Sequence, residues 1–195
     1  MASNGLHPAE HRGYRELYAA LRQIVDHWST VASSLGTGEV AGALEGGVED
    51  AGRLLGELAD RTAGYDLYGH PAAQALGTSM ARGRLAIRSR ALDRNQVLRL
   101  AVLDAVHVTT LLAYLAAVAG SRGDEALRSF CEDWERRMAL TESAVRRAVV
   151  NTGASPDEGL GPLTESSVGR AAHGAAHAVG ALGEWIDRRA ARRGG

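Results

Sequence analysis

Several residue types are scarce or missing in this chain. Its 195 residues include one cysteine, Cys131, and no lysine, so all 22 basic side chains are arginines. A single cysteine excludes an intramolecular disulfide and suits a reducing compartment such as the cytoplasm. The net charge is −1, which gives no general reason to expect nucleic acid or an acidic membrane surface as a partner.

Signals of other protein classes are missing too. The sequence has no zinc-type cysteine and histidine spacing, no glycine-rich phosphate loop and no serine nucleophile elbow. No basic start followed by an apolar run opens the chain, as a signal peptide would require. Segment 97–118 is long enough to cross a bilayer, but Arg99, Asp104 and His107 interrupt it, which favours a buried helix. These absences predict a cytoplasmic protein that does not enter a membrane.

What the chain does contain is helical periodicity. Apolar residues recur at steps of three and four, and turn residues separate the runs. This pattern predicts an all-α protein with helices over 8–34, 39–61, 71–90, 93–120, 124–150 and 164–192. We expect a helical bundle over 8–150, a linker over 151–163, and a C-terminal helix over 164–192 that packs on the bundle or on a partner subunit.

The lengths of the connections predict the topology. The links after the first and third main helices are short, so each should join antiparallel neighbours. About thirty residues separate the second main helix from the third, which is enough for a helical crossover along a bundle roughly 30–40 Å long at ~1.5 Å per residue. Two hairpins joined by one long crossover indicate a ferritin-like four-helix bundle rather than the simple up-down-up-down form.

Asp104 and His107 stand out as polar residues in the most apolar segment. At helical spacing they continue one seam with five other residues, namely Val97, Leu100, Leu111, Tyr114 and Val118. We therefore expect both side chains to point into the core, where an unpaired charge is strongly unfavourable. Three interpretations stay open: a buried hydrogen-bonded pair satisfied by an arginine such as Arg88 or Arg90, a pair of metal ligands, or an acid–base pair in a small-molecule pocket.

Short stretches of the sequence resemble a known family. Residues 17–25, 39–44 and 104–120 resemble parts of the bacterial ferritin-like stress proteins of the YciE/YciF type. The similarity covers roughly residues 14–150 and rests on spacing and short matches. The resemblance implies a ferritin-like bundle, a role in stress response, and a dinuclear metal site built from carboxylates and histidine on four facing helices.

Carried over to this chain, the family's metal site is incomplete. The glutamate of the first helix falls on Leu21 and the histidine of the second on Gly47, and neither residue offers a ligand atom. The paired acids of the fourth helix fall near Arg136 and Arg137. Glu135 and Glu142 lie nearby and flank the seam of that helix. A dinuclear site uses about six protein ligands, whereas Asp104, His107, Asp50 and a nearby acid such as Glu135 supply only about three or four.

Two hypotheses from different classes follow. The leading one is a cytosolic ferritin-like bundle that has lost the usual dinuclear metal site, needs no cofactor, and acts by binding or assembly as a homo-oligomer. The alternative is a metal-dependent oxidoreductase or small-molecule enzyme with a reduced site centred on Asp104 and His107. In that alternative, Asp50 and Glu135 would complete the shell of one iron or manganese ion, or the bundle core would take up a small molecule.

A second histidine pair needs its own interpretation. His173 and His177 have the i, i+4 spacing that can chelate a metal, and Glu184 continues their helical stripe. Glu184 lies about 10 Å further along the axis, so one helix does not bring all three side chains to one ion. We expect this pair to lie on a solvated or interface face.

A regulatory or adaptor bundle that recognises a partner helix is a third hypothesis.

Overall fold

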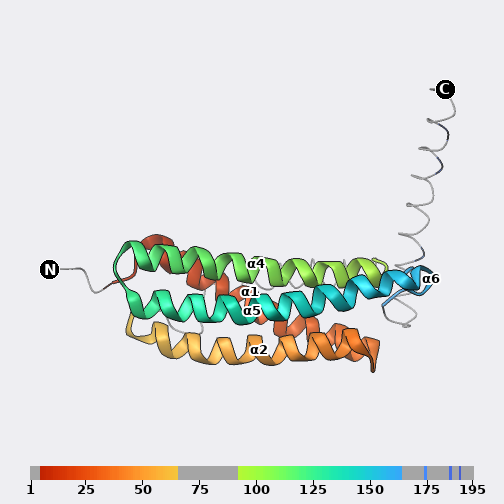
Figure 1. The fold of residues 1–195 in the computed structure, drawn as a ribbon, viewed down its shortest axis with the longest axis horizontal. Coiled ribbons are helices and arrows are strands. Elements are labelled where there is room, and N and C mark those ends of the chain that lie inside the picture. The colour runs from red at the N-terminus through yellow and green to blue at the C-terminus, as the bar shows by residue number, and fades with distance from the viewer. Residues whose placement is uncertain (1–4, 66–91, 164–173, 175–184, 186–188, 190–195) are drawn as a thin grey trace.

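The computed structural model describes residues 5–65 and 92–163, together with residues 174, 185 and 189 (Figure 1). Within these residues the secondary structure is helical, and the only strand-like pairing is an isolated bridge between Asp93 and Pro162. The expected all-α fold class is therefore confirmed. The elements, in chain order, are α1 (Pro8–Leu35), α2 (Glu39–Thr62), η1 (Ala63–Tyr65), α4 (Arg94–Ser121), α5 (Glu125–Asn151), η2 (Thr152–Ala154) and α6 (Pro156–Gly159).

The four long helices begin and end within one or two residues of the positions expected from the sequence. Local capping contacts fix the starts of α1, α4 and α5. Asp93 and Gln96 form the expected capping box before α4, where the backbone N–H of Asp93 donates to the Gln96 side chain at 3.0 Å. His7 caps α1 in the same way, and its backbone N–H donates to the Glu10 carboxylate at 2.8 Å. Capping of this kind satisfies backbone groups that the first helical turn leaves unpaired.

Several expectations concern residues outside the described part of the chain. These are the crossover helix over 71–90 with its arginines Arg88 and Arg90, and the C-terminal helix over 164–192 with His173 and His177. The expected linker over 151–163 is described. Its last residue, Leu163, is 5% exposed and belongs to the core, and the carbonyl of Gly161 accepts from the backbone N–H of Arg94 at 2.9 Å.

Contacts between helix ends fix the directions of the four long helices. Arg122 at the end of α4 pairs with Glu10 at the start of α1, and Tyr65 after α2 bonds to Asp124 at the start of α5. We call this end of the bundle, where Glu10 lies, the Glu10 end. α1 and α5 both pack against α2 and α4, so neighbouring helices are antiparallel. The chain therefore leaves α2 at the Glu10 end and enters α4 at the opposite end.

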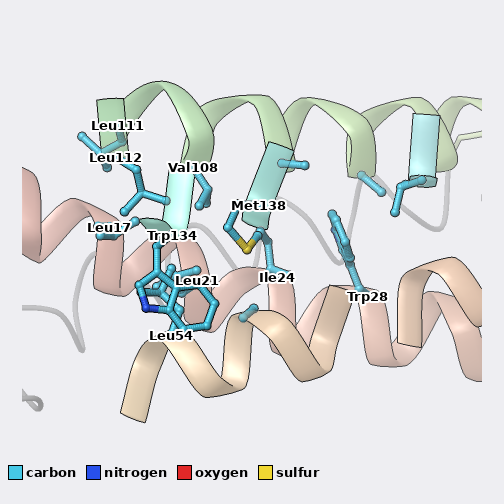
Figure 2. Close-up of a cluster of buried hydrophobic side chains, with 14 of the residues drawn as sticks. Leu17, Leu21, Ile24, Trp28, Leu54, Val108, Leu111, Leu112, Trp134 and Met138 are labelled. Carbon is cyan, nitrogen blue, oxygen red and sulfur yellow. The ribbon is translucent and has the colours of Figure 1, made fainter. Parts of the chain in front are cut away.

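Apolar side chains from all four helices fill the interior (Figure 2). Periodicity identified the inward faces of α1 and α5, because both helices have a clearly polar opposite face. Every residue expected inward on these two helices is buried, namely Tyr14, Leu17, Leu21, Ile24, Trp28 and Val31 on α1, and Leu127, Cys131, Trp134, Met138, Val145 and Ala148 on α5.

The inward face expected for α4 is wrong in part. Tyr114 is 49% exposed, while the buried face of α4 consists of Val97, Leu98, Ala101, Ala105, Val108, Leu111, Leu112, Leu115, Ala116 and Ala119. The helix is apolar on nearly all sides, so its sequence period does not select one face. Among the described helices, α4 is also long and apolar enough to cross a membrane by length and composition, a property that core helices of water-soluble bundles share.

Candidate functional site

Asp104 lies between α4 and α1 and is held by three side chains of α1. Its carboxylate accepts hydrogen bonds from Nε2 of Gln23 at 3.1 Å and from Nε1 of Trp28 at 3.4 Å. Gln23 donates to Oδ1 and Trp28 to Oδ2, and Nδ1 of His27 also lies 3.3 Å from Oδ2. The Asp104 side chain is 18% exposed and that of His27 is 8% exposed. We call these four residues the Asp104 cluster; it ties two helices together with hydrogen bonds that satisfy a half-buried carboxylate.

The expectation that His107 points into the core is wrong. Its side chain is 51% exposed, and Nε2 lies 3.3 Å from a carboxylate oxygen of Glu16, itself 57% exposed. His107 and Asp104 therefore have separate partners, although both lie on α4. The polar pair that the sequence suggested is replaced by Asp104 with His27. From its place beside Trp28 on the first helix we expected His27 to lie on the surface, and this expectation is wrong because the residue is buried against Asp104. The one available signal was its spacing on α1, where His27 precedes the buried Trp28.

Asp50 and Glu135 lie on the other side of the bundle from the Asp104 cluster. Asp50 of α2 accepts a 2.6 Å hydrogen bond from Oγ1 of Thr141 on α5, and it also pairs with Arg53. Glu135 is half-buried on α5. Because the α1–α4 and α2–α5 contacts form opposite sides of the bundle, these side chains do not meet Asp104. Among the residues that the structure describes, no three His, Cys, Asp or Glu side chains are grouped to hold a metal.

The residues at the centre of the bundle do not fit a dinuclear metal site. A Cβ atom on Gly47 would lie 2.3 Å from Cζ3 of Trp28 and 3.1 Å from Cγ2 of Thr141. The Trp28 ring thus occupies the space that a ligand side chain at position 47 would need. Leu21, the other position at which the family resemblance implies a ligand, has no exposed surface. Figure 2 shows Trp28, Ile24 and Met138 along this interior.

A second polar cluster lies at the Glu10 end and was not expected from the sequence. The Glu10 side chain has no exposed surface, and its carboxylate accepts from Nε of Arg122 at 2.7 Å and from a terminal nitrogen at 3.2 Å. Arg122 also lies 3.4 Å from Asp124, which accepts a 3.0 Å hydrogen bond from the Tyr65 hydroxyl. Partial burial and this bond to Asp124 raise the pKa of Tyr65. We call Glu10, Arg122, Asp124 and Tyr65 the Glu10 cluster.

Tyr14 and Cys131 form a buried pair one turn inside the Glu10 cluster. The hydroxyl oxygen and the sulfur are 3.5 Å apart, and both residues are at most 2% exposed. Burial raises the pKa of Cys131 to about 11, although the hydrogen bond between this thiol and Tyr14 opposes the shift. Burial, followed by the nearby Cys131, raises the pKa of Tyr14 as well. Both groups stay protonated at neutral pH, so the thiol lacks the thiolate form that makes a cysteine reactive.

The polar groups in both clusters are therefore engaged in holding helices together. The Asp104 cluster joins α1 to α4, and the Glu10 cluster joins the starts of α1 and α5 to the end of α4. Comparison with known proteins adds no relative: no family model, no curated protein and no solved structure matches this chain.

Proposed function

We propose that this protein is a cytosolic helical bundle of the ferritin-like type that has no dinuclear metal centre and acts by binding or assembly. The observation that carries the proposal is the packing of Trp28 against Gly47, because a Cβ at position 47 would lie 2.3 Å from the indole ring. A core filled in this way stabilises the bundle by burying apolar surface and leaves no space for ligands to two metals.

The order and direction of the helices support the ferritin-like part of the proposal. α2 ends at the Glu10 end of the bundle and α4 begins at the opposite end. A bundle of two helical hairpins joined by a connection along its whole length has this arrangement, whereas an up-down-up-down bundle would begin its third helix where the second ends.

The outer surface supports action by assembly. α4 exposes Leu103 to 61% and Tyr114 to 49%, and α5 exposes Leu140 to 74% and Val150 to 69%. Single exposed apolar residues are ordinary on a protein surface. α4 differs because its composition is apolar along most of its length, so that apolar side chains lie on its exposed side as well as in the core. Burial of such a face against a second copy would remove apolar surface from water.

Metal analysis tests the absence of a dinuclear centre. The full chain, purified without chelators and reloaded with iron or manganese under reducing conditions, should hold only substoichiometric metal after desalting. The amount should be the same in an Asp104→Asn, Asp50→Asn double variant. Stoichiometric metal that this double variant loses would overturn the proposal, since those carboxylates would then be ligands.

Sedimentation velocity tests the assembly. The 20.5 kDa chain should sediment as a homo-oligomer, and Leu103→Glu should shift it toward the monomer. Glu45→Gln, a change on the exposed side of α2, serves as the control and should leave the oligomer intact. A monomeric wild-type protein, or recovery of the protein with membranes after cell fractionation, would contradict the proposal of a cytosolic assembly.

A further inference from the structure

A pocket of about 330 Å³ lies at the end of the bundle opposite Glu10. It is formed where α1 turns into α2, α4 begins and α5 ends. Its apolar lining includes Leu98, Ala41 and Ala148, each at most 3% exposed. Its polar lining includes Asn95 and Thr152. The volume is at the lower end of the range for small-molecule sites, and the mixture of an apolar floor with a few polar groups is typical of them.

Arg94 gives this pocket a positive charge without an evident counter-charge. Its Nε atom is buried and has no hydrogen-bond partner, and among the described residues no carboxylate forms an ion pair with its guanidinium group. The residue as a whole is half-buried. Placing a cation there is unfavourable unless an anion or a set of acceptors compensates. Among the described residues, the pocket therefore contains a half-buried arginine whose buried Nε atom has no hydrogen-bond partner.

The start of α2 adds to the positive potential in the pocket, whereas the start of α4 is capped by Asp93. Arg94 is the first residue of α4, a position where a cation is disfavoured by the helix dipole. α2 also begins here, after Gly38, whose position at the N-cap provides no side-chain hydrogen bond. The first backbone N–H groups of α2 have no partner within the helix, and the residues that carry them, Glu39, Val40 and Ala41, line the pocket together with Arg94. Such groups are well suited to bind an anion.

Two carboxylates also line the pocket and would repel a bound anion. Glu39 and Glu158 are both exposed. The Glu39 oxygens accept from the Asn151 amide at 3.2 and 3.3 Å, and neither carboxylate pairs with Arg94. Because both are solvated, their repulsion of an anion is screened but not abolished.

We propose that this pocket binds a small organic anion, with its carboxylate against Arg94 and the start of α2, and a short apolar body against Leu98 and the two alanines of the floor. A carboxylate matches the fork of the guanidinium group and accepts from backbone N–H groups. The apolar floor favours a ligand with a ring or short chain over a bare inorganic ion. The proposal concerns a different part of the molecule from the metal question and is independent of it.

Titration calorimetry on the full chain tests the proposal, with benzoate as the anionic probe and benzamide as its uncharged match. Benzoate should bind saturably with a Kd below about 10 mM, and benzamide and inorganic phosphate should bind more weakly. Arg94→Gln should weaken benzoate binding about tenfold or more, since a charge-assisted hydrogen bond is lost. Arg147→Gln, which changes an exposed arginine near the same end of α5, should leave binding unchanged.

Glu158→Gln provides a test of sign that does not depend on loss of function. Removing this carboxylate should strengthen benzoate binding, because it removes a repulsive charge from the pocket lining. Circular dichroism and thermal unfolding would establish that each variant is folded. Three outcomes would overturn the proposal: no saturable binding of benzoate, equal binding of benzoate and benzamide, or benzoate binding in the folded Arg94→Gln variant that matches wild type.

Discussion

Glu10 and Arg122, which are 112 residues apart in the chain, form an ion pair of 2.7 Å in which the carboxylate has no exposed surface. The same glutamate side chain caps the start of α1 through the backbone N–H of His7. One buried carboxylate thus fixes the start of α1 and, through Arg122, the end of α4. Loss of either partner of such a pair is strongly destabilising, because the charge of the other partner then stays buried without compensation.

Replacing Arg122 should therefore destabilise the bundle strongly. We expect Arg122→Ala to lower the free energy of unfolding by about 3 kcal/mol or more, since Glu10 would keep its burial and lose its counter-charge. Urea unfolding followed by circular dichroism measures the change. Arg128→Ala is the control, because Arg128 pairs with Glu125 where both side chains are exposed (45% and 67%), and its effect should stay below about 1 kcal/mol. Equal effects of the two substitutions would contradict this assignment.

Gly47 and Gly46 offer a matched pair on α2. A Cβ on Gly47 would lie 2.3 Å from the Trp28 ring, whereas a Cβ on Gly46 would meet nothing within 4 Å. We expect Gly47→Ala to destabilise the protein by about 1–3 kcal/mol, because the buried indole has no space to move away. Gly46→Ala should stabilise it by up to about 1 kcal/mol through helix propensity. Thermal unfolding of both variants checks the prediction, and it fails if the two alanines act alike.

Periodicity predicted the parts of the fold in which each helix has one apolar and one polar side. On α1 and α5 this contrast identified the buried residues, and short turns and capping boxes fixed the helix ends. On α4 the contrast is missing, since the helix is apolar almost all round, and the rotation of the helix is decided by its packing against α1 and α5. The sequence therefore placed both Asp104 and His107 inward, whereas the structure half-buries Asp104 and exposes His107.

The polar clusters could not be predicted because their partners come from distant segments. His27 lies beside Asp26, which is exposed, and its burial depends on the position of Asp104 on another helix. Glu10 lies in the first turn of α1, but the sequence does not show that Arg122 would cover it. In each case the information lies in how two helices meet. That depends on packing across the whole core and not on local spacing.

Asp104 and His107 should respond differently to substitution, although the sequence suggested the same environment for both. Asp104→Ala removes the acceptor for Gln23, His27 and Trp28, and we expect a loss of about 1–3 kcal/mol in the free energy of unfolding. His107→Ala breaks only an exposed contact with Glu16 and should cost less than about 1 kcal/mol. Urea unfolding measures both changes. Tryptophan fluorescence should shift only in the Asp104 variant, since Trp28 donates to that carboxylate, and a shift in the His107 variant would count against the described contacts.

The buried thiol of Cys131 should make stability depend on pH in the alkaline range. Its pKa is raised from 9.0 to about 11 by burial, so the folded state holds the proton more tightly than the unfolded state. The stabilisation that this shift provides is complete below pH 9, where the thiol is protonated in both the folded and the unfolded state. It is lost as the pH rises through the pKa of the thiol in the folded state. We expect the free energy of unfolding to fall by about 2 kcal/mol between about pH 8 and pH 11 on account of this group.

Cys131→Ala isolates that contribution from the other groups that titrate at high pH. Tyr14 has a pKa raised in the same direction, so the variant should still lose stability above the ordinary tyrosine pKa of 10.0. The difference between wild type and variant should nevertheless shrink steadily from pH 9 upward, because only wild type loses the thiol's share. Urea unfolding at matched pH values gives this difference directly. A difference that stays constant with pH would mean that Cys131 titrates alike in the folded and unfolded states, which its burial at 0% exposure beside Tyr14 argues against.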